Sequence, residues 1–175
     1  MAYSFVVEDG TGKTTSTSYS SVADADQYID DIGGNSTWAS ASTSDKELAL
    51  IQGSQYLDLK YTRNWLGARV SGTQALAWPR ESVNIDGHLR NSNEIPANLK
   101  YATSELAVIW LVGSKADLFV DETAPAGPIK SENVSIGSIS VNTTYASASS
   151  TQKVYTKVNA LVSTLTAGAG RIVRS

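Results

Sequence analysis

Residues 74–80 read Gln-Ala-Leu-Ala-Trp-Pro-Arg, and this stretch separates two predicted helices. A residue directly before proline is held out of the α-helical region, in extended or polyproline geometry. We therefore expect the large apolar ring of Trp78 to have a fixed position and to pack between the helices. We interpret Trp65, Trp78, Pro79 and Arg80 as a structural anchor, in which Arg80 ties the loop to an acidic neighbour.

Length and composition favour one globular unit with a smaller appendage. The chain has 175 residues, of which 41% are hydrophobic and 18% are charged. It contains no cysteine, which excludes disulfides, thiolate metal sites and cysteine nucleophiles. No apolar run approaches the roughly 20 residues that a membrane span needs. Because the first residues also lack the features of a secretion signal, we expect a soluble protein that is made in the cytoplasm and binds no membrane.

Charge is distributed unevenly along the chain, although its net value is only −3. Residues 1–59 are rich in acidic side chains and carry Lys13 and Lys46 as their only basic ones. The basic side chains of residues 133–175, which include no acidic residue, are Lys153, Lys157, Arg171 and Arg174. An acidic front and a basic end can meet between copies of the chain or pair within one monomer.

Three helices are predicted between residues 21 and 118. Ser21 is a good cap for the first, and Ser44 with Glu47 has the spacing of a capping box that opens a second helix toward Thr62. Gly53 inside this second helix indicates close packing. Pro96 fits the first turn of a long central helix. The apolar faces comprise Val22, Ala25, Ile29 and Ile32, then Leu50, Ile51, Ser54, Leu57 and Tyr61, then Leu99, Ala102, Leu106, Ile109 and Trp110.

Residues 119–150 predict a linker that is followed by one β-hairpin near 130–145. A two-residue turn with Gly137 first pairs Ile136 with Ile139 and Val134 with Val141, which places all four apolar side chains on one face.

The last predicted helix has a single apolar stripe. Its members are Val154, Val158, Leu161, Val162 and Leu165. A lone helix of this kind is unstable in water, so we expect it to dock on a neighbouring copy or another partner protein. The basic tail, Arg171-Ile172-Val173-Arg174, is expected to add the final contact.

The predicted fold is therefore mainly α. It is a small helical bundle with a long central helix, one β-hairpin near 130–145 and a separate C-terminal helix. We divide it into an extended N-terminal arm (1–20), a helical core (21–118), a linker with the hairpin (119–150), and a C-terminal docking helix with the basic tail (151–175).

No residue pattern indicates catalysis, a cofactor or a metal. Gly10-Thr11-Gly12-Lys13-Thr14 is similar to the end of a phosphate-binding loop, but the first glycine of that motif and a following helix are missing. His88 is the only histidine and has no partner in its sequence neighbourhood. The aspartates between residues 24 and 31 lack the ligand spacing of a calcium loop. We expect no enzymatic activity, no cofactor and no bound metal.

Aromatic and basic residues alternate between positions 56 and 80. They are Tyr56, Lys60, Tyr61, Arg63, Trp65, Arg69, Trp78 and Arg80. Such residues can form a stacking platform with phosphate contacts, as in single-stranded DNA-binding modules. Alternatively, the aromatic rings pack the core and the cations surround it. We favour the core role and keep DNA binding as the alternative function.

Several blocks of this chain resemble the small head-to-tail adaptor proteins of tailed bacteriophages, also called head-completion or connector proteins. The blocks are Val7-Glu8-Asp9-Gly10-Thr11-Gly12, Ala49-Leu50-Ile51 with Tyr56-Leu57-Asp58, Trp65-x-Gly67-x-Arg69, the 74–80 stretch, Ile95-Pro96 with Lys100-x-Ala102-x-x-Glu105-Leu106-Ala107, Lys130-Ser131-Glu132-x-Val134, and Tyr155-x-x-Val158-x-x-Leu161. Some similar sequences are catalogued as DnaT-like single-stranded DNA-binding proteins. The chain departs from the adaptor pattern at Gly53-Ser54-Gln55 and in its Ser/Thr-rich region after Asn142.

The adaptor resemblance implies a structural virion protein in the phage neck, made in the bacterial host cytoplasm. It implies a dodecameric ring below the portal protein that extends the DNA channel. The ring would also attach the next neck, stopper or tail-terminator protein. Double-stranded DNA would pass through without sequence-specific binding, and weak phosphate contact would limit friction.

Overall fold

The fold is mainly α, as predicted, and a computed structural model describes residues 3–119, 121–122, 129–135, 140–145, 151–152 and 154–167. The chain forms two compact units, Met1–Leu118 with Tyr155–Ser175, and Phe119–Val154. The helices of the first unit are α1 (Val22–Asp31), α2 (Ser36–Ser40), α3 (Thr43–Tyr61), α4 (Ala97–Val112) and α5 (Thr156–Val162), which a 3-10 turn, Ser163–Leu165, follows. None of the described helices is both long and apolar enough to cross a membrane.

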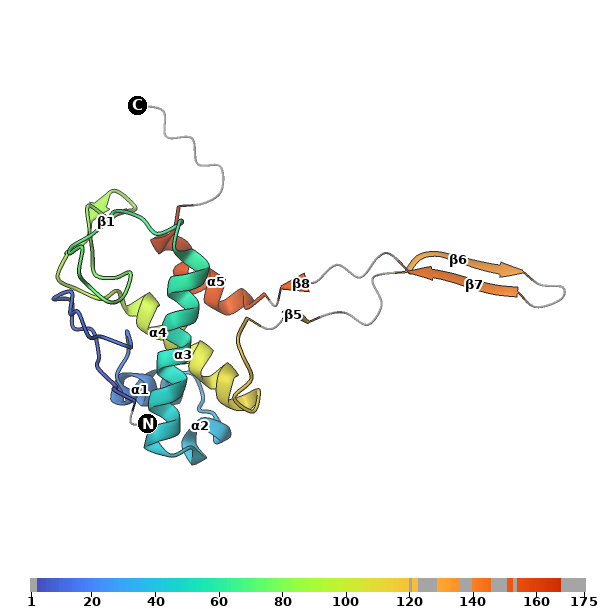
Figure 1. The fold of residues 1–175 in the computed structure, drawn as a ribbon, viewed down its shortest axis with the longest axis horizontal. Coiled ribbons are helices and arrows are strands. Elements are labelled where there is room, and N and C mark those ends of the chain that lie inside the picture. The colour runs from blue at the N-terminus through green and yellow to red at the C-terminus, as the bar shows by residue number, and fades with distance from the viewer. Residues whose placement is uncertain are drawn as a thin grey trace, which may run out of the picture. The chain divides into compact units, whose positions relative to one another are not determined.

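α3 runs through the helical unit, with α1 and α2 near its first turns and the loops around β1 beyond its last turn (Figure 1). These loops hold two short antiparallel pairs, β1 (Ala68–Arg69) with β2 (Arg80–Glu81), and β3 (Asn84–Ile85) with β4 (His88–Leu89).

The start of α1 was predicted correctly, whereas the predicted start of α3 was wrong. The Ser21 hydroxyl accepts a hydrogen bond from the Asp24 N–H, as a cap requires. α3 is capped by Ser42, which accepts from the Asp45 N–H, and not by Ser44. The predicted capping box does not form because Ser44 lies inside the helix, and the Glu47 carboxylate accepts from the Tyr3 hydroxyl instead.

A short helix that the sequence analysis missed, α2, adds Trp38 to the core. Asn35 caps it by accepting from the Trp38 N–H. The Trp38 ring is buried with Ala25, Ile29 and Leu50, and its Nε1–H donates to Asp26.

The predicted apolar faces of α3 and α4 form the centre of the core. Leu50, Leu57, Leu99 and Leu106 are fully buried. Gly53 is buried where α3 meets α4, and a Cβ atom there would lie 2.7 Å from the Thr103 carbonyl oxygen, so the close packing predicted for this glycine is confirmed. On α1, Ala25 and Ile29 are buried, but Ile32 is 51% exposed because the helix ends at Asp31.

The apolar stripe of the last helix is already covered within the chain, which corrects the docking prediction. α5 packs on α4, and Val158, Val162 and Leu165 are buried there, while Leu161 is half-buried. Val154 is 68% exposed and precedes the helix. The expectation that this stripe stays open for a partner is therefore wrong for the three buried residues. Arg171, Ile172, Val173 and Arg174 lie outside the described residues.

The second unit contains two antiparallel strand pairs among its described residues. β5 (Asp121–Glu122) pairs with β8 (Thr151–Gln152), and β6 (Ile129–Ser135) pairs with β7 (Ser140–Tyr145). Val134 lies opposite Val141, as the hairpin prediction required. Ile136, Gly137 and Ile139, which complete that prediction, lie outside the described residues.

Candidate nucleic-acid interface

Trp78 and Trp65 pack into the core beyond the end of α3. Trp78 is 1% exposed and meets the Trp65 ring edge to face, with 6.0 Å between ring centroids. The Trp65 ring in turn lies 5.4 Å from the Tyr61 ring. Pro79 is buried and follows Trp78 through a cis peptide bond. These contacts give the 74–80 stretch a fixed place against α3.

Buried polar groups hold the same stretch. The Gln74 amide donates to the carbonyls of Leu76 and Pro79. The Asp58 carboxylate accepts from the Ala77 N–H and from the Tyr19 hydroxyl, whose oxygen accepts from the Trp78 N–H. Burial raises the pKa of Asp58 and also the pKa of Tyr19.

Arg80 anchors its loop through hydrogen bonds to the backbone, and the acidic neighbour that the sequence analysis expected, Asp58, acts on it electrostatically without a hydrogen bond. Its guanidinium donates to three carbonyl oxygens, those of Leu66, Gly67 and Ala77. These acceptors are neutral, so the Asp58 carboxylate compensates the positive charge of Arg80 only through space. Burial lowers the pKa of Arg80.

Between residues 60 and 90 lies a group of cations that form no salt bridge among the described residues, and we call it the cationic lobe. Its members are Lys60, Arg63, Arg69, Arg80 and Arg90. Arg69 lies opposite Arg80 in the β1–β2 pair. The Lys60 ammonium donates to the Tyr56 hydroxyl, lies over the Tyr56 and Tyr61 rings, and has its pKa lowered by burial.

The other lysines in the described residues of the helical unit differ, because each pairs with a carboxylate. The pairs are Lys13–Asp9, Lys46–Asp26, Lys100–Asp24, Lys115–Asp45 and Lys157–Glu105. The exposed carboxylates nearest in sequence to the cationic lobe are those of Glu81 and Asp86. Within the described residues of the helical unit, the cations without a salt bridge are thus concentrated between residues 60 and 90.

The aromatic rings of this region are core residues and not a stacking platform. Tyr56, Tyr61, Trp65 and Trp78 are all buried, whereas Arg63, Arg69 and Arg90 are exposed. The structure thus agrees with the favoured prediction, in which the rings pack the core and the cations surround it. Arg90 was missed because no aromatic residue accompanies it in the sequence.

The loop that is similar to a phosphate-binding loop is filled by the protein's own carboxylate. Glu8 is 1% exposed, and it accepts from the N–H groups of Gly10, Gly12 and Lys13 and from the Ser16 hydroxyl. The donors that could bind a phosphate are therefore occupied.

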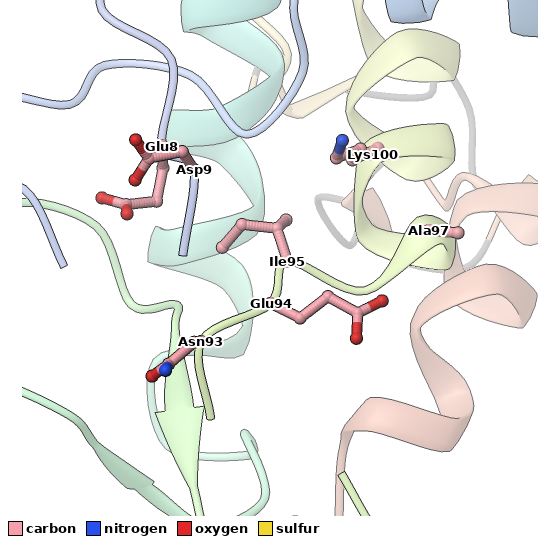
Figure 2. Close-up of a pocket in the computed structure, with 7 residues that line it drawn as sticks. All are labelled: Glu8, Asp9, Asn93, Glu94, Ile95, Ala97 and Lys100. Carbon is pink, nitrogen blue, oxygen red and sulfur yellow. The ribbon is translucent and has the colours of Figure 1, made fainter. Parts of the chain in front are cut away.

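The neighbouring pocket of about 250 Å³ is a poor phosphate site because carboxylates dominate its lining (Figure 2). Asp9 and Glu94 join Glu8 there, against the single ammonium of Lys100. His88 is exposed at the start of β4, and no three potential metal ligands come together within the described residues.

Comparison with known proteins identifies a family. A family model described as "Putative DnaT-like ssDNA binding protein" matches residues 3–175, which include the whole cationic lobe. No curated protein and no solved structure matches the chain.

Proposed function

Since the chain belongs to the family of DnaT-like single-stranded DNA-binding proteins, we propose that it binds single-stranded DNA through its cationic lobe. The observation that carries the proposal is that Lys60, Arg63, Arg69, Arg80 and Arg90 form no salt bridge with a carboxylate of the described residues. Cations that are not paired within the protein can replace the counterions of phosphates, which is the main source of nonspecific DNA affinity.

The buried aromatic rings shape the expected binding mode. Base stacking on an exposed ring adds about 1–3 kcal/mol per base. The four aromatic rings of residues 56–78 are buried and therefore cannot stack on bases. Binding should therefore follow the phosphate backbone, tolerate any base sequence and weaken steeply with salt.

Removing three exposed cations together tests the proposal. In the Arg63→Ala/Arg69→Ala/Arg90→Ala variant, the slope of log K against log salt for a short single strand should fall by about 2, at about 0.7 per phosphate contact. Fluorescence anisotropy over a salt series measures this slope.

Lys115→Ala is the control, because it removes the same charge from the Lys115–Asp45 pair, outside the lobe. An equal loss of slope per charge in this control, or an unchanged slope in the triple variant, would contradict binding at the lobe.

A second candidate function is the head-to-tail adaptor that the sequence resemblance implies, and one observation favours it. The described residues of Phe119–Val154 form only two-stranded pairs. Such ribbons are at best marginally stable alone in water, so a further surface is expected to complete this unit. In this proposal the chain is a virion protein of the neck. It forms a homo-oligomeric ring between the portal and the next neck or tail protein, around passing double-stranded DNA. In either role it acts by binding and not by catalysis, without a cofactor.

Electron microscopy of the purified chain and of a virion that carries it tests the adaptor role. Closed rings at the head-tail junction are the expected result. A chain that stays monomeric with its portal partner and is absent from the virion would exclude the adaptor role and leave the DNA-binding proposal intact.

A further inference from the structure

Two tyrosines stack between α1 and α4 and line a pocket of about 240 Å³. The rings of Tyr28 and Tyr101 lie 4.4 Å apart with an angle of 12° between their planes. Tyr101 is 37% exposed. Asp24, Gln27, Asp31 and Lys100 line the same pocket, which we call the tyrosine pocket.

The tyrosine pocket keeps one negative charge without a cationic partner. The Asp24 carboxylate pairs with the Lys100 ammonium at 3.1 Å. The Asp31 carboxylate accepts from the neutral Gln27 amide at 2.8 Å, and no cation pairs with it among the described residues. A flat aromatic stack beside a free carboxylate suits a guanidinium, which can stack on the ring and form paired hydrogen bonds with the carboxylate.

The opposite side of the stack is already occupied within the chain. The Tyr28 hydroxyl donates to Glu105, and the Lys157 ammonium of α5 pairs with Glu105 and lies 5.8 Å from the centre of the Tyr28 ring. Neither Glu105 nor Lys157 lines the tyrosine pocket. The pocket is therefore not on the α5 side of the Tyr28 ring.

The chain contains one short segment whose chemistry matches the tyrosine pocket. Residues 168–175 include Arg171 and Arg174, which flank Ile172 and Val173, and include no acidic residue. This segment follows Ala167, whose N–H donates to the Asn64 carbonyl next to Arg63 of the cationic lobe. Ala167, the last described residue before this segment, thus lies beside the cationic lobe in its own chain.

We propose that the basic tail of one copy binds the tyrosine pocket of a second copy, with an arginine stacked on Tyr101 and paired with Asp31. The pocket and the tail are different surfaces, so the contact is head to tail, and it builds a ring if the rotation between copies closes. The inference deepens the assembly candidate above and is independent of DNA binding at the cationic lobe.

Sedimentation velocity over a concentration series tests the contact in the full-length chain. Wild type should associate, whereas Tyr101→Ala and Arg171→Glu/Arg174→Glu should each weaken association at least about tenfold. Tyr101→Phe keeps the ring and should associate like wild type. Matching circular dichroism and thermal unfolding curves show that the variants are folded.

Mixing the two defective variants gives the decisive result. Tyr101→Ala has an intact tail and Arg171→Glu/Arg174→Glu has an intact pocket, so the mixture should form one-to-one dimers and nothing larger. A wild type that is monomeric throughout, a mixture without dimers, or variants that associate like wild type would each overturn the proposal. If the tail instead bound the pocket of its own chain, the mixture of the two variants would contain no dimers. Salt-dependent DNA binding of monomeric Tyr101→Ala, whose lobe is intact, reports separately on the DNA proposal.

Discussion

Replacement of Trp78 by alanine is expected to lower the free energy of unfolding by about 3–5 kcal/mol, the range for buried large aromatic residues. Trp78 is 1% exposed and packs edge to face on Trp65, so the substitution leaves a cavity at the centre of the 74–80 stretch. Urea unfolding followed by circular dichroism measures the loss.

Trp78→Phe is the matched variant. It keeps most of the buried ring and removes the indole Nε1–H, which has no acceptor among the described residues. Removal of an unpaired buried donor is favourable, and this offsets part of the lost packing. The loss should therefore be much smaller than for alanine. Equal losses for the two variants, or a loss below about 1 kcal/mol for alanine, would contradict the anchor role of this ring.

Replacement of Glu8 by alanine is expected to cost at least about 3 kcal/mol, because each buried donor that loses its acceptor costs about 1–3 kcal/mol. It leaves four donors without their acceptor, the N–H groups of Gly10, Gly12 and Lys13 and the hydroxyl of Ser16. The loop also packs closely on the segment before α4, because a Cβ atom at Gly10 would lie 2.1 Å from the Asn93 carbonyl oxygen. Denaturant unfolding and amide hydrogen exchange of the loop measure the effect.

Two further variants serve as comparisons for Glu8→Ala. Glu8→Gln places an amide N–H₂ group against two of these donors, so it should also be strongly destabilising. Asp9→Asn alters the adjacent, exposed carboxylate, which pairs with Lys13, and should change stability by less than about 1 kcal/mol. A Glu8 variant that is as stable as Asp9→Asn would show that water satisfies the loop instead.

Local sequence patterns predicted most of the helical architecture. The cap at Ser21, the helix after Pro96 and the apolar faces of α3 and α4 depend on residues within a few positions of one another. The Val134–Val141 pair likewise depends on a short connection. The start of α3 was predicted wrongly because Ser42 and Ser44 are both suitable cap residues, and the local sequence does not decide between them. The hydrogen bond between Tyr3 and Glu47 joins residues that are distant in sequence, so it could not be predicted from a local pattern.

The candidate DNA interface was only partly predictable. The sequence analysis identified Lys60, Arg63, Arg69 and Arg80 as a group, but it could not tell which cations remain unpaired. That difference arises because most of the paired lysines of the helical unit meet carboxylates distant in sequence, as Lys100 meets Asp24. The tyrosine pocket was not predicted at all, since Tyr28 and Tyr101 are separated by most of the helical unit.

The sequence by itself thus determined that the chain is mainly helical, where most of its helices lie, and that Trp78-Pro79 separates two of them. Only the tertiary structure decided that the stripe on α5 covers its own α4, that Glu8 fills its own loop and that the aromatic rings between residues 56 and 78 face inward. The physical reason is the sequence separation over which each kind of interaction acts. Caps, turns and apolar periodicity act between near neighbours, whereas burial and charge pairing depend on which distant segments meet when the chain packs.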